Sequence, residues 1–413
     1  MSTETEAREL DAGDDLPSLR DQYHIPPAGG GRYAETAYLA GNSLGLQHRS
    51  VRSRLLGELD DWARLGVEGH RDAKHPWLAY HELLREPAAR LIGARPAEVV
   101  MMNSLTVNLH LMMISFYRPA GQRHAIVVED STFPSDSYAV RSQAALHGYD
   151  ADSTVIRLRP RDGESALRSD DVVAFLRDRG DRVALVLLGA VNYLSGEWLD
   201  IPAITEAGRA AGAVVGWDLA HAAGNVPLHM HDWDVDWAAW CTYKYLNAGP
   251  GAVAGCFVHE RHLADRTLPK LSGWWGTRPA TRFAMAPVID PVDSADSWQL
   301  SNPPILAMAP VLGSLEVFDA IGMDRLRAKS VRLTAYLESL LDGFTILTPR
   351  STDRRGAQLS VRVRNAAQVS RELRYSYGVI ADHREPDVIR LAPAPLYSTY
   401  HDCWRAAEAL AHV

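Results

Sequence analysis

One aspartate and one lysine stand in sequence settings that point to cofactor chemistry. The apolar run of residues 213–217 predicts a buried strand, and Asp218 stands where that strand ends. Lys244 lies in a second apolar run, residues 236–245, where a charged amine is costly to bury unless it is neutral or forms a Schiff base. We therefore expect pyridoxal 5′-phosphate (PLP), with Lys244 forming the imine and Asp218 keeping the pyridine nitrogen protonated. On this pair alone, a turn aspartate and a lysine that reaches out to solvent remain an alternative.

A helix start that follows the strand predicted over residues 98–102 offers a place for a phosphate. Asn103 or Ser104 can cap this helix, which leaves free N–H groups and the positive end of the helix dipole near Leu105 and Thr106. The same spacing also fits an ordinary N-cap without a ligand.

Ring-binding and charged side chains stand near other predicted element ends. Phe133 and Asp136 lie where the next helix begins, and Phe133 can either stack on a flat ring or merely pack. Trp274 lies in an aromatic run between glycines, which is a poor core but a good wall for a ring. Arg390 ends a predicted strand and can clamp a carboxylate, although a surface arginine fits this evidence equally well.

The remaining polar stretches are less specific. Asn42 and Ser43, which lie between glycines, form a shaped turn that either presents amides and a hydroxyl to a ligand or is only a tight loop. His70 lies in a polar stretch, and a lone histidine of this kind is usually a surface residue or a satisfied core residue.

Two histidines two positions apart raise the question of a metal. His229 and His231 stand beside Asp232, and such a set can ligate zinc. The sequence shows no third anchored ligand, so we expect no metal site.

The order of the predicted elements indicates an α/β protein. Strands predicted over 98–102, 125–129, 154–158, 183–188 and 213–217 alternate with helices of ten or so residues. This alternation predicts a mostly parallel sheet with helices on both faces, and the family resemblance described below implies that this sheet is of the seven-stranded type. Ligands of such sheets bind at the carboxyl ends of the strands, where Asp136, Asp218 and Lys244 are all expected.

A second, smaller α+β lobe is expected at the end of the chain. One long helical region over about 305–341 leads into strands and helices predicted at 344–347, 357–363, 366–375, 388–391 and 399–411. We divide the chain into an N-terminal arm with a joining helix (1–65), a large PLP-binding domain (66–310) and a small C-terminal domain (311–413). The acidic residues 1–22 are expected to form a loose part of the arm.

Composition excludes several classes of function. The chain has 413 residues and a net charge of −8, which argues against a nucleic-acid partner or an anionic membrane surface. No apolar run is long enough to span a membrane, and the first residues lack the pattern of a secretory signal. The three cysteines are widely spaced and odd in number, which fits a reducing cytoplasm.

Taken together, these segments resemble kynureninase, a PLP-dependent hydrolase of the aspartate-aminotransferase-like fold (fold type I). The resemblance extends from about residue 38 to about 405. It rests on the order and spacing of motifs at 39–47, 105–110, 133–136, 218–222, 243–249, 273–276, 301–306, 384–386 and 389–390.

The resemblance implies a role for each matching residue. Lys244 is similar to the Schiff-base lysine, Asp218 to the pyridinium partner, and Tyr243 to a catalytic proton relay. The implied cofactor shell consists of Leu105, Thr106, Phe133, Asp136, Asp218, His221, Tyr243, Lys244, Trp274 and Asn302. The implied substrate contacts are Asn42, Ser43, His70, Ser301, Asn302 and Arg390, with Arg390 on the α-carboxylate. In this fold two subunits share each site, so a homodimer is implied.

Two positions depart from the family pattern. Gly189 stands where the family often has a serine of the cofactor shell, and Thr277 stands where it often has a histidine. His70, Ser301 and Asn302, in contrast, match the members that prefer 3-hydroxykynurenine. Polar groups that hydrogen-bond a ring hydroxyl would discriminate strongly against a ring without it.

The function implied is hydrolysis of the Cβ–Cγ bond of L-kynurenine or 3-hydroxy-L-kynurenine to an anthranilate and L-alanine, with the hydroxylated substrate favoured. A relative in secondary metabolism that acts on a further-substituted kynurenine is one alternative. Another fold type I enzyme, such as an aminotransferase or a desulfurase, is a second, although the three cysteines lie in predicted strands or a helix and not on a mobile loop. A catalytically idle ligand sensor is a third.

Overall fold

A seven-stranded sheet forms the centre of the computed structural model, which describes residues 3–29 and 32–413. Its strand order is β2 (Val99–Met101), β8 (Gly255–Val258), β7 (Trp237–Trp240), β6 (Val214–Asp218), β5 (Val183–Gly189), β3 (Ala125–Glu129) and β4 (Val155–Leu158). The strands from β7 to β4 are parallel to one another, and β8 runs antiparallel to both of its neighbours. Most of these strands are apolar runs buried on both faces, as expected for a parallel sheet covered by helices. The predicted fold class is confirmed.

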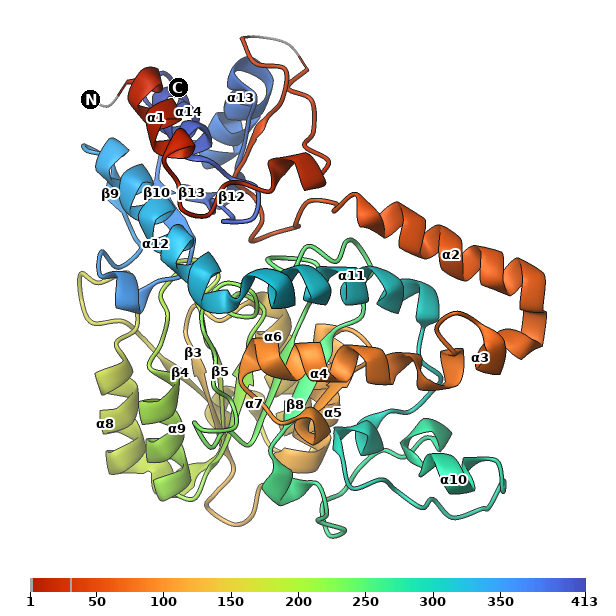
Figure 1. The fold of residues 1–413 in the computed structure, drawn as a ribbon. Coiled ribbons are helices and arrows are strands. Elements are labelled where there is room, and N and C mark those ends of the chain that lie inside the picture. Colours follow the sequence, from red (N-terminus) through yellow and green to blue (C-terminus); the bar gives the residue numbers. More distant parts are fainter. Residues whose placement is uncertain (1–2, 30–31) are drawn as a thin grey trace.

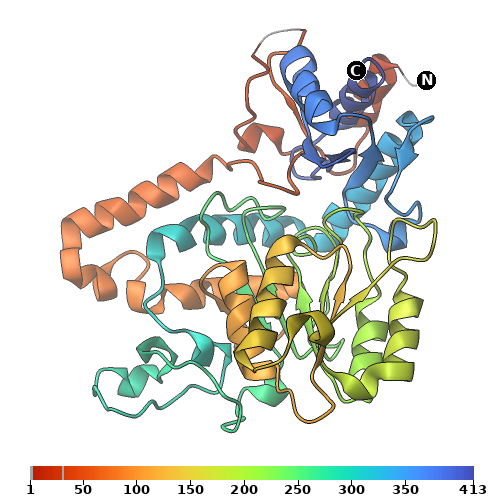
Figure 2. The same cartoon turned by 180° about the vertical axis from the view of Figure 1, so that it is seen from behind.

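Helices cover both faces of this sheet (Figures 1 and 2). One face packs against α4 (Tyr80–Ile92), α8 (Ser169–Arg179), α9 (Ile201–Ala210) and α11 (Ile305–Ile321). The other face packs against α5 (Leu105–Phe116) and α6 (Pro134–Leu146), with the short α7 (Ala151–Thr154) beside β4. The helices therefore hold the strand ends rigidly, which is what a site at those ends requires.

A smaller antiparallel sheet follows, in the order β12 (Asp382–Arg384), β13 (Val388–Leu391), β10 (Leu359–Arg362) and β9 (Thr345–Ile346). Its helices are α12 (Met323–Leu340), α13 (Ala366–Tyr377) and α14 (Tyr400–Leu410). Near the start of the chain, β1 (Ala37–Tyr38) pairs with β11 (Val379–Ile380), so early and late residues share one apolar core. The boundaries that we place at 65/66 and 310/311 stay a prediction.

The single helical region predicted over 305–341 is wrong, because the helix breaks at Gly322. This glycine has φ +86°, in the left-handed region that other residues avoid. The two helices on either side, α11 and α12, meet at an angle of 83°. Within the described ranges no single helix is long and apolar enough to cross a membrane, and this bent pair alone passes the test by length and composition.

The loose arm predicted for residues 1–22 is also wrong, because its first part is a docked helix. Helix α1 (Glu4–Ala12) begins with a capping box between Thr3 and Glu6. It packs against α14, and Asp11 accepts the first backbone N–H groups of that helix from Tyr400 and His401, at 2.7 and 3.1 Å. Charge composition alone could not reveal these contacts, because their partners lie at the other end of the chain.

A helical arm, α2 (Ser50–Leu65), extends away from both sheets and turns at α3 (Gly69–Asp72) (Figure 1). Several apolar side chains on and after it are exposed, namely those of Leu56, Leu59, Trp62 and Val67. A shorter helix, α10 (Pro279–Arg282), lies in the long connection between β8 and α11.

Candidate active site

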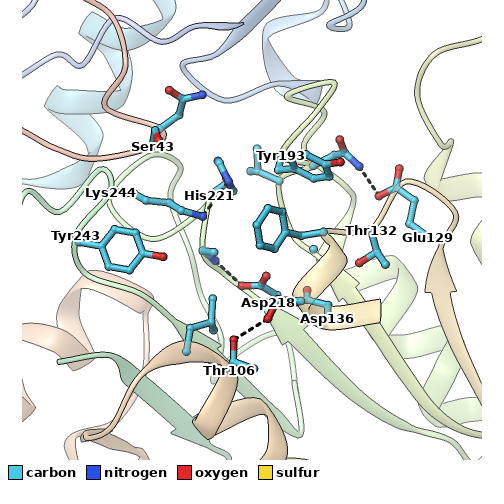
Figure 3. Close-up of a pocket in the computed structure, with 18 of the residues that line it drawn as sticks. Ser43, Thr106, Glu129, Thr132, Asp136, Tyr193, Asp218, His221, Tyr243 and Lys244 are labelled. Carbon is cyan, nitrogen blue, oxygen red and sulfur yellow. Dashed lines mark hydrogen bonds between the residues drawn. The ribbon is translucent and has the colours of Figure 1, made fainter. Parts of the chain in front are cut away.

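A cavity of about 390 Å³ opens at the carboxyl ends of the central strands, within the usual size range of small-molecule sites. Figure 3 shows side chains from several elements pointing into it. The structure brings together ten of the predicted site residues in its wall: Asn42, Ser43, Leu105, Thr106, Phe133, Asp136, Asp218, His221, Tyr243 and Lys244.

Asp218 closes strand β6 and is buried at the base of the cavity. Its carboxylate accepts a hydrogen bond of 2.7 Å from the backbone N–H of Ala220. Asp136, in the first turn of α6, is its neighbour, and burial followed by repulsion from Asp218 raises the pKa of Asp136 well above its ordinary value. Asp136 therefore keeps a proton and donates it in a hydrogen bond to Asp218. The pair carries one negative charge, held where a protonated ring nitrogen can meet it.

Lys244 approaches the same space from another side. The strand predicted around it ends earlier, because β7 stops at Trp240 and Lys244 lies in the turn that follows. Its Nζ lies 3.0 Å from Nε2 of His221. Burial, and then the positive charge of Lys244, lower the pKa of His221 well below its ordinary value, so the imidazole is neutral. Across the described chain, the buried Nδ1 of His221 has no hydrogen-bond partner, which marks it as a group awaiting a ligand.

The start of helix α5 forms an anion cradle in the cavity wall. Ser104 makes no side-chain cap hydrogen bond within the described structure, so the first-turn N–H groups are not covered by it. The hydroxyls of Thr106 and Ser135 lie 2.8 Å apart beside them. Free N–H groups, hydroxyls and a helix dipole are the groups that hold a phosphate.

Two aromatic side chains complete the arrangement. Phe133 precedes α6 and is 43% exposed, with its ring centroid 5.9 Å from Lys244 Nζ. Tyr243 lines the cavity next to Lys244, and burial raises the pKa of its phenol, so it stays protonated and can donate. An open ring face, an amine, a buried carboxylate and an anion cradle around one space fit PLP.

Sequence reasoning missed several residues in the same wall, among them Glu129, Asn192 and Arg384. Glu129 ends β3 as Asp218 ends β6, and that position was the available signal. It accepts a hydrogen bond of 2.7 Å from Asn192 Nδ2, and burial raises the pKa of its carboxyl. Arg384 was noted within a motif without a role, yet its side chain lines the cavity.

Arg390 occupies a different position from the one its predicted role suggests. Its guanidinium is fully buried in β13, with Nε 2.9 Å from Asp382 Oδ1 and a hydrogen bond of 2.7 Å to the carbonyl of Tyr193. Its positive charge still reaches the site, because it contributes to lowering the pKa of His221.

Four predicted residues, Trp274, Asn302, His70 and Ser301, lie outside the cavity of this chain as far as its described residues define it. Trp274 is 41% exposed and its Nε1 donates a hydrogen bond of 3.0 Å to Asn302 Oδ1. His70, on α3, meets Trp77 edge-on with ring centroids 5.5 Å apart. Ser301 and Asn302 are exposed in a loop before α11. The side chains of Ser301 and Asn302 are therefore accessible on the surface of this chain.

The sequence is similar to a family model and to curated relatives. The model of the kynureninase C-terminal domain matches residues 326–410. A kynureninase of Salinispora tropica is 66% identical and covers 100% of this chain and 97% of its own length. Kynureninases of Myxococcus xanthus (54% identical, 99% and 96% covered) and Koribacter versatilis (53%, 98% and 97%) are also similar throughout.

Solved structures share the fold at low sequence identity. The cysteine desulfurase CsdA of Escherichia coli superposes with a TM-score of 0.76 at 16% identity, covering 95% of this chain and 97% of its own. A variant of the cystine C–S lyase C-DES, solved with glycine covalently linked to its PLP cofactor, has a TM-score of 0.77 at 16% identity, covering 91% and 97%. The fold is thus that of PLP enzymes of type I, and the full-length similarity to curated relatives shows that the chain belongs to the kynureninase family.

Proposed function

We propose that this kynureninase prefers 3-hydroxy-L-kynurenine and hydrolyses its Cβ–Cγ bond to 3-hydroxyanthranilate and L-alanine. Cleavage of kynurenine by a PLP enzyme is the activity of the family to which the chain belongs. The observation that supports the PLP-dependent reaction is the meeting of Lys244, Asp218 and the unpartnered imidazole nitrogen of His221 around one cavity.

The cofactor is PLP, whose ring accepts electrons from bonds broken at the amino acid it carries. Lys244 would hold its aldehyde carbon, and Asp218, with the proton of Asp136 beside it, would hold the ring nitrogen. Phe133 would cover the ring face. Leu105 and Thr106 would hold the phosphate at the start of α5. Trp274 and Asn302 of the partner subunit would contribute further contacts to the cofactor.

The proton transfers belong to this chain's own side chains. The Nζ of Lys244, once free, takes the proton from the substrate Cα, and the neutral His221 at 3.0 Å keeps that amine oriented. Tyr243 donates its proton to the γ-carbonyl oxygen, regains one from the water that adds there, and donates that proton to Cβ when the Cβ–Cγ bond breaks; the aromatic half leaves as the acid and returns a hydroxyl proton to Tyr243. Water adds to the γ-carbonyl, and the bond to the aromatic ring half of the substrate then breaks.

The substrate's α-carboxylate is expected at the arginine end of the cavity. Arg384 lines the wall directly, and both it and the fully buried Arg390 pair with Asp382, at 2.9 and 2.8 Å, so the two arginines and this aspartate keep one net positive charge. Asn42 and Ser43 border the same cavity from the β1 side. Two guanidinium groups near one anion provide both charge and the fork geometry that suits a carboxylate.

The proposed preference for the hydroxylated ring depends on side chains that a second copy of the chain would supply. The resemblance implies that His70, Ser301 and Asn302 favour the hydroxylated ring, and all three lie outside this chain's own cavity as far as its described residues define it. We therefore propose a homodimer in which each subunit supplies these side chains to the other's site. The exposed apolar residues of the α2 arm, with Trp62 60% exposed, support burial of this surface by a partner.

The cysteines argue against a desulfurase-type reaction. All three are free and buried, and burial raises the pKa of each thiol above its ordinary value. A desulfurase needs a reactive thiolate, which these environments suppress. Free, widely spaced cysteines also support our proposal of a cytoplasmic location.

The test is kcat/KM on L-kynurenine and on 3-hydroxy-L-kynurenine, measured side by side with PLP-loaded protein. We expect a preference of tenfold or more for the hydroxylated ring, which corresponds to about 1.4 kcal/mol of transition-state discrimination. Asn302→Ala should reduce kcat/KM for the hydroxylated ring more than for the plain ring, which serves as the internal control. Lys244→Ala should abolish turnover of both.

Equal or better turnover of plain kynurenine would contradict the ring preference while leaving the family reaction intact. If neither ring is cleaved but a further-substituted kynurenine is, the enzyme belongs to secondary metabolism. Turnover retained by Lys244→Ala would overturn the assignment of the lysine itself.

A further inference from the structure

Three side chains from distant parts of the sequence meet at a second polar site, formed by Glu98, His231 and His259. One potential ligand atom from each lies within 4.8 Å of the others. The Nδ1 of His231 is 2.9 Å from Glu98 Oε1, and the Nδ1 of His259 is 3.8 Å from the same oxygen. Zinc bonds of about 2.0–2.1 Å in tetrahedral geometry place neighbouring ligand atoms roughly 3.3 Å apart, and the two distances lie on either side of that value.

The site lies at the opposite edge of the sheet from the cavity. Glu98 directly precedes β2, His259 directly follows β8, and His231 lies in the loop that leads into β7. The groups of the active site, by contrast, follow the carboxyl ends of β3, β5, β6 and β7. The length of the strands therefore separates this site from the reaction.

The carboxylate of Glu98 is held in a fixed orientation. It is fully buried, and its two oxygens accept backbone N–H groups of Glu260 and Arg95, each at 2.8 Å. A buried carboxylate is unfavourable unless it is paired or coordinated, and here the nearest ionisable side chains are two histidines.

His259 is already in the tautomer that a metal ligand needs. Its Nδ1 accepts the backbone N–H of Arg261 at 3.3 Å, so the lone pair is on that nitrogen, and coordination there would replace this hydrogen bond with a bond to the ion. Its Nε2 lies 3.3 Å from Asp234 Oδ1, so the proton is on the side of the carboxylate. A carboxylate behind a ligating histidine is the usual outer partner of such sites.

The positive charges nearest to the cluster are occupied by other acids. The guanidinium of Arg261 pairs with Asp234 and Asp236, at 2.8 and 2.7 Å. Arg95 pairs with Glu260. An incoming cation would therefore meet the free charge of Glu98 and not a free guanidinium.

We propose that Glu98, His231 and His259 bind a divalent transition-metal ion of the zinc class that ties three segments together at this edge of the sheet. Binding needs one proton to leave Nδ1 of His231, so that this nitrogen coordinates the ion in place of donating to Glu98. His231 is partly exposed, which gives the ion a path and leaves the fourth position to water. The sequence showed only the pair His229 and His231, because the other two ligands come from segments that folding alone brings near.

The test uses PLP-loaded enzyme without an affinity tag, equilibrated with zinc chloride, dialysed against metal-free buffer and assayed for zinc by mass spectrometry. We expect one zinc per chain, and a melting temperature raised by about 2–5 °C when zinc is present. His231→Asn is the test variant, because its amide can still donate to Glu98 but offers no ring nitrogen. His229→Ala is the matched control, an exposed histidine two positions away.

His231→Asn should lose both the zinc and the shift in melting temperature and should keep kcat/KM, whereas His229→Ala should keep all three. Cofactor absorbance and the melting temperature without zinc show whether each variant is folded. Wild-type enzyme that retains no zinc after dialysis would overturn the proposal. So would a folded His231→Asn variant that retains as much zinc as the wild type, since the metal would then be held elsewhere.

Discussion

At the scale of single residues, the site residues that can be predicted from the sequence are ionisable residues in or next to apolar runs. Asp218 and Lys244 are ionisable residues in or next to hydrophobic runs, and the structure places both in one cavity. Glu129 and Arg384 line the same cavity but were not singled out. Acids and arginines at strand ends have many ordinary uses, so position alone does not separate a site residue from a surface residue.

Gly189 allows a test of a departure from the family pattern. It ends β5 beside Asp218 and lines the cavity. A Cβ built there would contact, among the described atoms, the carbonyl of Val191 alone, at 3.7 Å, so a serine fits without strain. Gly189→Ser should lower the dissociation constant of PLP about 2- to 10-fold, the effect of one added hydrogen bond.

Titration of the apoenzyme with PLP, followed by absorbance, measures this change. Gly189→Ala is the matched control, because it adds the same Cβ without a hydroxyl and should leave the affinity near that of the wild type. Equal affinities for the serine and alanine variants would show that the hydroxyl does not reach the cofactor.

The buried carboxyl of Glu197 should make the stability of the fold depend on pH. Burial raises its pKa from 4.5 to about 7, although it pairs with Arg354. Between these two values the folded chain binds a proton that the unfolded chain releases, so stability is lost as the pH rises through about 7. Glu197→Gln cannot ionise, and relative to the wild type it should be more stable at pH 8 than at pH 5 by about 1–2 kcal/mol.

Urea unfolding of both proteins at the two pH values, with PLP held constant, gives this difference directly. The pKa of about 7 already includes the attraction of Arg354, so the comparison reports the net cost of ionising Glu197 and cancels only those effects of the substitution that do not depend on pH. If the free energies of unfolding of wild type and variant differ by the same amount at pH 5 and at pH 8, the pKa of Glu197 is not raised in the folded chain.

At the scale of elements, regular alternation of apolar runs was sufficient to predict the central sheet and the helices that cover it. The predictions of elements were wrong where contacts between distant parts of the sequence determine the structure. Helix α1 forms because it docks on α14, Gly322 breaks a continuous apolar pattern, and β7 ends before Lys244 although the sequence remains apolar. Periodicity reports local burial, and none of these three outcomes is set locally.

The packing of β6 against β7 makes a sharp prediction for one glycine. A Cβ on Gly216 would lie 2.2 Å from ring carbons of Trp237, which is fully buried in the neighbouring strand and cannot move aside. Gly216→Ala should therefore destabilise the fold by about 1–3 kcal/mol, the usual effect of overpacking. Differential scanning calorimetry of PLP-loaded protein should show a clear fall in melting temperature.

Gly57 is the contrasting position. It lies inside α2, and within the described structure no atom comes within 4 Å of a Cβ built on it. Gly57→Ala should raise stability by up to about 1 kcal/mol, because alanine favours the helix. If the two alanine variants melt alike, the close contact with Trp237 does not constrain the sheet.

At the scale of the whole molecule, one chain holds the cofactor groups but not the proposed ring contacts. The exposed Trp274–Asn302 pair and the exposed apolar side chains of the α2 arm belong to the same chain. If a second copy covers them, the site is complete only in the dimer, and this has a consequence that can be measured by mixing inactive variants.

Co-expression of Lys244→Ala with the double variant Trp274→Ala/Asn302→Ala should restore activity. Half of the random dimers are mixed, and each mixed dimer has one site with an intact lysine and an intact partner loop, so activity should reach about a quarter of the wild-type value. Co-expression of Lys244→Ala with Asp218→Asn is the matched control. Both of those residues line the cavity of one chain, so no mixed dimer contains an intact site and no activity should return. Equal recovery in the two mixtures would mean that Lys244 and Asp218 of one site come from different subunits. No recovery in either would mean that each subunit completes its own site, and the ring contacts would then have to be sought among the residues that line this chain's own cavity.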